Sequence, residues 1–421
     1  MSTDVSPAAV PDLSRRDQTL DLARVAAVFL VVVVHLLQVG VGRDPDGVIV
    51  SSRPAEAQPW FDAATWVGQI MPLFFVVGGF ASAAGWASWT ARGGDAAGFV
   101  RTRILRLVQP ALPLFGLVAV ILLGARVAGA DPALVDAAVV GIGMPLWFLA
   151  AYLLCQLVVP VAVRAHECAP RLSLGILALG TIAVDALRFA TGVELLGYLN
   201  MLFVWPLIQQ LGFWYRDGWF DRRGIPTLLS GAGAAYLLLG AVVAWGPYSS
   251  SMLANLNPPT LPLVLLGVAQ ACLLRVARPI LTALMHTRPA RAVVFAMGSR
   301  LMTVYLWHLP VILMVSGLAL LVPGAAPAPA SGEWWATRPV LFLVVAAVLG
   351  ALSVPLARVE SLGRLAPAPR PWLIGVAWLL AFLPPFAVTV AGMDTVLAVA
   401  GALMFTASVL ILRSRSGRTA R

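Results

Sequence analysis

The first long apolar stretch of the sequence carries three ionisable residues on one helical face. Asp21 and Arg24 stand near its start, and His35 follows Arg24 after ten intervening residues. On an α-helix, eleven steps of about 100° return to the same side, with a rise of about 16 Å between Arg24 and His35. Asp21 is placed to pair with Arg24. Because imidazole titrates near neutral pH, His35 is a candidate general base, whereas a histidine packed against another helix is the alternative.

A second apolar histidine lies in the sequence Tyr305-Leu-Trp-His308-Leu-Pro310. Tyr305 and His308 are three residues apart and can face one site on a helix. Pro310 should free a backbone carbonyl nearby. Packing alone would also explain each of these residues. His166 and His286 fall between apolar stretches, so we expect them at the surface.

Arg103 and Arg106 form a basic pair just before an apolar stretch. Three residues apart, they are neighbours on a helical face. Guanidinium groups bind phosphate in a bidentate manner, so the pair could anchor the phosphates of a ligand such as coenzyme A. The alternative is a role in membrane orientation or in contact with lipid headgroups.

Two further motifs combine aromatic residues and glycines. Phe75 precedes the pair Gly78 and Gly79, and such glycines let a second helix or a ligand approach closely. Trp147 and Phe148 follow a proline at an expected helix start. Close helix packing is the alternative explanation for both motifs.

The composition predicts that long membrane helices position these residues. Of the 421 residues, 60% are hydrophobic and 11% are charged, against about 25% charged in a soluble domain. We expect an all-α, polytopic transmembrane helix bundle and a surface helix over 277–300. About twelve segments have the length of a span, namely 20–41, 61–86, 108–127, 134–163, 172–190, 196–215, 226–245, 261–276, 303–322, 340–356, 372–390 and 396–412.

The distribution of arginine predicts the orientation of the chain. Arginine-rich segments alternate with poorer ones, so both termini should be cytoplasmic. The net charge of +10 then reflects this orientation and does not indicate nucleic-acid binding. Residues 1–17 should form a disordered cytoplasmic tail. Cys155, Cys168 and Cys272 lack the spacing of metal ligands, so no metal is expected.

Together these motifs resemble those of the acyltransferase-3 family of bacterial membrane acyltransferases. Asp21, Arg24 and His35 match the family's first-span pattern. Phe74, Phe75, Gly79 and Phe80 match a second motif, in which Gly78 replaces a serine. The remaining motifs follow in family order, at Arg103 and Arg106, at Trp147 to Leu149, and at Tyr305 to Pro310.

The resemblance implies transfer of an acyl group, by default acetyl, from cytoplasmic acyl-CoA to an acceptor hydroxyl. Arg24, Arg103 and Arg106 would bind the donor, and Asp21 would orient Arg24. His35 would be the general base or would carry the acyl group covalently. The implied pocket residues are Phe75, Gly78, Gly79, Trp147, Phe148, Tyr305 and His308.

The expected acceptor is an exported glycan, a glycolipid or a small molecule, and O-acetylation of a surface polysaccharide at the plasma membrane is the default reaction. Membrane lipid is the other expected partner, and the oligomeric state stays open. The expected domain covers 18–358, and 371–413 adds two further helices. A twelve-span secondary transporter is the alternative function, and a catalytically inactive membrane scaffold is the third.

Overall fold

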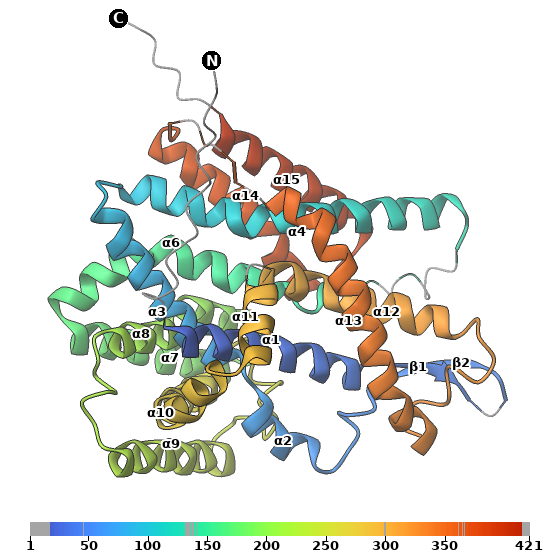
Figure 1. The fold of residues 1–421 in the computed structure, drawn as a ribbon, viewed down its shortest axis with the longest axis horizontal. Helices are drawn as coiled ribbons and strands as arrows, with labels where there is room; N and C mark the ends of the chain where they lie inside the picture. The colour runs from blue at the N-terminus through green and yellow to red at the C-terminus, as the bar shows by residue number, and fades with distance from the viewer. Residues whose placement is uncertain are drawn as a thin grey trace, which may run out of the picture.

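The computed structural model describes residues 17–414 except 45, 131–134, 136–138, 140, 299, 361, 364 and 366. In this part of the chain, eleven helices are long and apolar enough to span a membrane. The predicted all-α, polytopic helix bundle is therefore confirmed (Figure 1). Of the predicted disordered tail, residues 1–16 lie outside the described residues.

The elements follow one another as helices with a single small hairpin. The first half contains α1 (Gln18–Gln38), β1 (Gly40–Arg43), β2 (Ile49–Ser52), α2 (Phe61–Gly68), α3 (Met71–Thr90), α4 (Ala96–Val127), α6 (Leu146–Cys168), α7 (Pro170–Thr191) and the 3₁₀ helix η2 (Glu194–Leu202). The second half contains α8 (Val204–Arg216), α9 (Ile225–Trp245), α10 (Leu261–Met285), α11 (Arg288–Gly298), α12 (Leu301–Ala319), α13 (Gly332–Glu360), α14 (Pro371–Ala391) and α15 (Thr395–Arg413).

The predicted span at 196–215 is wrong as a single helix. The chain forms η2 and then α8, whose 13 residues extend only about 20 Å, less than the membrane core of about 30 Å. Pro206 lies in the first turn of α8 and Asn200 is fully buried in η2. Most of α8 is buried against other helices, so protein surrounds it where lipid would surround an ordinary span.

Other boundaries also differ from prediction: α4 begins at Ala96 and not near 108, and α13 covers Gly332–Glu360 and not 340–356. The span expected at 61–86 consists of α2 and α3, separated at Gln69 and Ile70, with Pro72 in the first turn of α3. The surface helix expected over 277–300 is also divided. α10 continues to Met285, and the separate α11 buries no residue of its own.

The α3 and α8 helices cross with their backbones in contact. A Cβ atom on Gly79 would collide with the carbonyl oxygen of Gln209, and one on Gly212 would lie 2.9 Å from the Gly79 Cα. Only glycine permits so close an approach. For Gly79, the structure supports the helix-packing alternative.

A buried carboxylate connects α7 to the segments around it. Asp185 is 1% exposed. It accepts hydrogen bonds from Asn200 Nδ2 at 2.7 Å, the Tyr248 hydroxyl at 3.0 Å and the Leu261 backbone N–H at 2.9 Å. These donors satisfy the buried charge, and they tie η2 and the start of α10 to α7.

The two C-terminal helices lie along α4 and α6 (Figure 1). Trp378 of α14 donates a hydrogen bond to the Leu153 carbonyl of α6 at 3.1 Å. Phe405 of α15 packs edge-on against Phe115 of α4, with ring centroids 4.7 Å apart. Through these contacts α14 supports α6, the helix that carries Trp147, and α15 supports α4.

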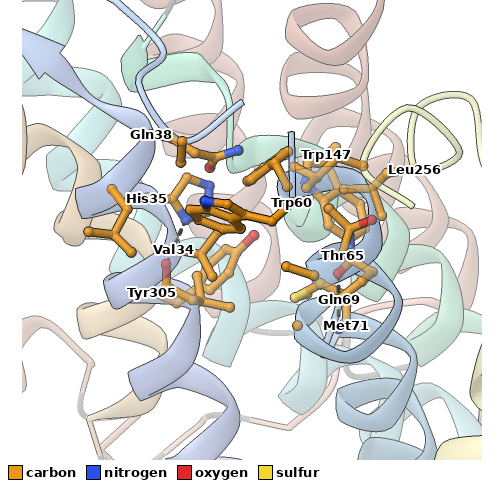
Figure 2. Close-up of a pocket in the computed structure, with 17 residues that line it drawn as sticks. Val34, His35, Gln38, Trp60, Thr65, Gln69, Met71, Trp147, Leu256 and Tyr305 are labelled. Atoms are coloured by element: carbon orange, nitrogen blue, oxygen red, sulfur yellow. Dashed lines mark hydrogen bonds between the residues drawn. The ribbon is translucent and has the colours of Figure 1, made fainter. Parts of the chain in front are cut away.

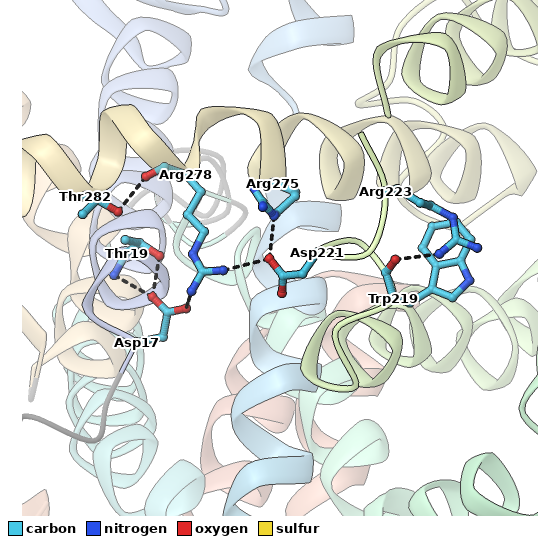
Figure 3. Close-up of polar contacts among 8 residues, drawn as sticks. All are labelled: Asp17, Thr19, Trp219, Asp221, Arg223, Arg275, Arg278 and Thr282. Atoms are coloured by element: carbon cyan, nitrogen blue, oxygen red, sulfur yellow. Dashed lines mark hydrogen bonds and ion pairs between the residues drawn. The ribbon is translucent and has the colours of Figure 1, made fainter. Parts of the chain in front are cut away.

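Polar contacts hold α1 at its start. Asp17 caps the helix by accepting a hydrogen bond from the Thr19 backbone N–H at 3.1 Å. Arg278 of α10 pairs with Asp17 at 3.4 Å and with Asp221 at 2.8 Å, and Arg275 pairs with Asp221 at 2.6 Å (Figure 3). This arginine–aspartate network therefore joins α1 and α10 to the segment that follows α8.

The other end of α1 is held by the β1–β2 hairpin and the segment after it. Gly40, two residues beyond the helix, pairs with Ser52 in the hairpin. The Ala55 backbone N–H donates to the Leu37 carbonyl at 3.3 Å. The α1 helix is thus fixed at both ends.

Candidate active site

His35 of α1 lies beside His308 of α12. The two rings meet edge to face with centroids 4.8 Å apart. His308 Nε2 is 3.3 Å from His35 Nδ1, which is also 2.8 Å from the Val31 carbonyl oxygen. The sequence singled out each histidine but did not predict that the two would be in contact.

These contacts determine which nitrogen of each ring carries a proton. His308 Nδ1 contacts the Tyr305 carbonyl, which can only accept, so Nδ1 is protonated and Nε2 has a lone pair. His35 Nδ1 must likewise donate to the Val31 carbonyl, and its proton can be shared with His308 Nε2. His35 Nε2 is then unprotonated and able to accept a proton, as a general base requires.

His35 lines a cavity of about 150 Å³ (Figure 2). Trp147 and Tyr305, both predicted pocket residues, also line it. Trp60 is 50% exposed and lies at the α2 side of the cavity. The lining residues are mainly apolar, namely Val31, Val34, His35, Leu37, Gln38, Ala55, Trp60, Phe61, Ala64, Thr65, Gly68, Gln69, Met71, Trp147, Leu253, Leu256 and Tyr305.

An aromatic cluster forms the wall behind this cavity. Trp147 stacks on Trp205 with centroids 5.1 Å apart, and Phe75 stacks on the same indole at 4.4 Å. Phe148 packs against Tyr305 at 4.5 Å. Phe75 and Phe148 therefore support the lining residues without lining the cavity themselves.

The predicted pocket glycines do not line the cavity. Gly79 lies in the α3–α8 crossing. A Cβ on Gly78 would lie 3.2 Å from the Tyr152 ring and 3.3 Å from its hydroxyl oxygen, so Gly78 makes room for that tyrosine. The serine of the family pattern would crowd Tyr152 here.

The predicted donor-binding arginines gather near the start of α1. Arg24 lies 4.0 Å from Asp21, as the spacing predicted. Arg103 packs its guanidinium over the Phe99 ring, 4.8 Å from the centroid. Arg106 follows Arg103 by three residues on α4, and Arg103 also interacts electrostatically with Arg24.

The cavity does not extend to these arginines, because none of the three lines it. Aromatic rings connect the three arginines to the cavity. Tyr152 interacts electrostatically with Arg103 and stacks on Phe148 at 5.3 Å, and Phe148 in turn contacts Tyr305. Tyr152 is partly exposed. An aromatic wall thus runs from the arginines to His35, and the cavity approaches His35 from the α2 side.

The expectation that His166 lies at the surface is wrong. His166 is 5% exposed. Its Nε2 lies 2.9 Å from Asp217, and its Nδ1 lies 3.2 Å from Gln210 Nε2. These contacts were not predictable from local spacing, because both partners lie more than forty residues further along the chain.

A family model for an acyltransferase domain matches residues 17–358, most of the chain. The chain belongs to the acyltransferase-3 family. It is therefore a multi-pass membrane acyltransferase, and the family match favours acyl transfer over the transporter alternative. Neither the comparison with curated proteins nor that with solved structures gave a match. α14 and α15 lie beyond the matched residues.

Proposed function

We propose that this acyltransferase-3 protein transfers an acyl group, by default acetyl, from acyl-CoA to an acceptor hydroxyl at His35. The observation that carries the proposal is the pattern of contacts around the two ring nitrogens of His35. Its Nδ1 is engaged by Val31 and His308, while its Nε2 is available at a cavity. A neutral imidazole with a free ring nitrogen beside a cavity has the lone pair and the access that a general base needs.

We place the donor at the arginine end of α1. Arg103 interacts electrostatically with Arg24 and Arg106, and guanidinium groups suit the phosphates of CoA. Asp21 supports Arg24 from the preceding turn. The CoA arm would run along the wall formed by Tyr152 and Phe148 to bring the thioester to His35.

The proposed reaction is direct transfer. His35 Nε2 removes the proton of the acceptor hydroxyl as its oxygen attacks the thioester carbonyl carbon. The tetrahedral intermediate expels the CoA thiolate, which takes the proton from His35, so the ester and free CoA leave a neutral imidazole. His308 keeps the His35 ring in its working orientation. A covalent acyl-histidine intermediate is the alternative route.

We further propose that the arginine-rich end and both termini face the cytoplasm, with the protein in the plasma membrane. The cavity beside His35 would then receive its acceptor on the outer side, which suits an exported glycan, a glycolipid or a small molecule. In this proposal residues 18–358 form the catalytic domain, and the helices of 371–413 support it.

The purified protein in detergent provides the test. We expect slow hydrolysis of acetyl-CoA and ester formation with added alcohols, both lost in His35→Ala by about 10²- to 10⁴-fold. Arg103→Ala should raise the KM for acetyl-CoA with a smaller change in kcat. Arg291→Ala is the control, because this arginine lies on the exposed helix α11. Turnover that survives in His35→Ala would contradict the proposed base.

A further inference from the structure

Gln38 is a polar residue of the cavity that the catalytic proposal does not use. It follows His35 by three residues on α1, so the two side chains are neighbours on the helix. Both line the cavity, and Figure 2 shows Gln38 next to His35 on the same helix. Gln38 is 3% exposed.

The orientation of the Gln38 amide is fixed from outside the cavity. Its Nε2 donates to Glu56 Oε1 at 3.0 Å. Arg53 holds the Glu56 carboxylate in turn, with Nη1 at 3.2 Å and 3.3 Å from the two oxygens. A carboxylate only accepts hydrogen bonds, so the amide nitrogen must face Glu56 and the amide oxygen must face away from it.

The Gln38 oxygen has no hydrogen-bond partner in the described part of the chain, although it is buried. A buried carbonyl oxygen without a partner is costly, and such groups are uncommon in folded proteins. Two other polar side chains of the cavity, Tyr305 and His35, do not donate to it. The Tyr305 hydroxyl donates to the Pro145 carbonyl at 2.9 Å, and His35 has no proton on its free nitrogen.

We infer that Gln38 Oε1 accepts a hydrogen bond from a second donor group of the acyl acceptor, next to the hydroxyl that is acylated. This inference rests on the proposed function. The site therefore selects vicinal diols and amino alcohols, whose paired groups can reach His35 Nε2 and Gln38 Oε1 together. The apolar lining with Trp60 and Trp147 suits the carbon face of a ring that carries such groups.

Two alcohols that differ by one hydroxyl test this subsite. Acetyl transfer from acetyl-CoA is measured with trans-1,2-cyclohexanediol and with cyclohexanol. We expect a wild-type preference of about tenfold or more in kcat/KM for the diol, because the monool leaves the buried oxygen without a partner. Gln38→Met removes the oxygen at similar size, so the preference should fall to about one.

Gln58→Met is the matched control. Gln58 lies two residues after Glu56 but does not line the cavity, so this variant should keep the wild-type preference for the diol. If Gln38→Met does not fold, Glu56→Leu replaces it, because the Gln38 amide nitrogen then loses its acceptor and its fixed orientation, and the preference should decrease.

The outcomes separate the two proposals. Turnover of both alcohols at equal rates by the wild type, unchanged in Gln38→Met, would show that water meets this oxygen and would overturn the subsite alone. A wild type that neither hydrolyses acetyl-CoA nor acetylates either alcohol would overturn the proposed function, and the subsite with it.

Discussion

Replacing Gly212 by alanine should destabilise the protein far more than the same change elsewhere in the bundle. An added Cβ would lie 2.6 Å from the Phe80 backbone nitrogen and 2.9 Å from the Gly79 Cα, and it would also collide with the Val76 carbonyl oxygen. All three are backbone atoms of α3, so no side-chain rotation relieves the clash. α3 and α8 would have to separate.

The size of this effect follows from the packing of α8. Overpacking a filled core costs about 1–3 kcal/mol, and a backbone clash along an extensive helix contact places Gly212→Ala at about 3 kcal/mol. The control is Gly233→Ala, since a Cβ there meets nothing within 4 Å. This control should change stability by less than about 1 kcal/mol and towards greater stability, because alanine favours the helix.

Unfolding in mixed micelles of increasing denaturing detergent, followed by tryptophan fluorescence, would measure both variants. Phe75, Trp205 and Trp147 are stacked beside the crossing, so separation of the helices should also change the emission of the folded state. Equal unfolding midpoints for Gly212→Ala and Gly233→Ala would refute the direct backbone contact between α3 and α8.

Two further predictions concern the histidine pair and the buried carboxylate. His308→Leu should lower kcat for acetyl-CoA turnover by about tenfold or more without changing its KM, whereas His308→Gln should recover part of the loss because an amide oxygen can accept from His35. Equal losses in both variants would indicate a packing role only. Asp185→Ala should destabilise the protein by about 3 kcal/mol, because it leaves buried donors without a partner. Glu167→Ala, at an exposed site, should stay within about 0.5 kcal/mol in the same unfolding assay.

The elements that the sequence predicted well are helices that form one uninterrupted apolar stretch. α1 and α9 each show such a stretch, because a helix that crosses a membrane needs about 20 mainly apolar residues. The η2–α8 segment escaped this reasoning because protein encloses it, so neither length nor uniform hydropathy is required there. Its crossing with α3 depends on the pairing of Gly79 with Gly212, two glycines from distant parts of the chain.

The sequence predicted which residues of the candidate site share a helical face, but not which helices bring their residues into contact. The spacing of Asp21, Arg24 and His35 placed them on one face of α1, since helical geometry is local. The contact between His35 and His308 links residues 273 positions apart, and no periodicity predicts such a pairing. Gln38 was not predicted as a site residue, because an amide near a helix end is common. Its role depends on the hydrogen bond to Glu56, which orients the amide and which the sequence does not show.

Because α1 is held at both ends, the positions of Arg24 and His35 along it are fixed relative to the rest of the protein. Asp17 is anchored to α10 at one end, and Gly40 is anchored in the hairpin at the other. In the proposed reaction, the helix between them would set the distance from the phosphates of acyl-CoA at the arginines to its thioester carbon at His35. Deleting one residue between Arg24 and His35 would turn the imidazole about 100° away from His308 and shorten that distance by about 1.5 Å. An insertion or deletion in this interval should therefore abolish activity even where it leaves the helix intact, because the number of residues sets both the distance and the direction of His35.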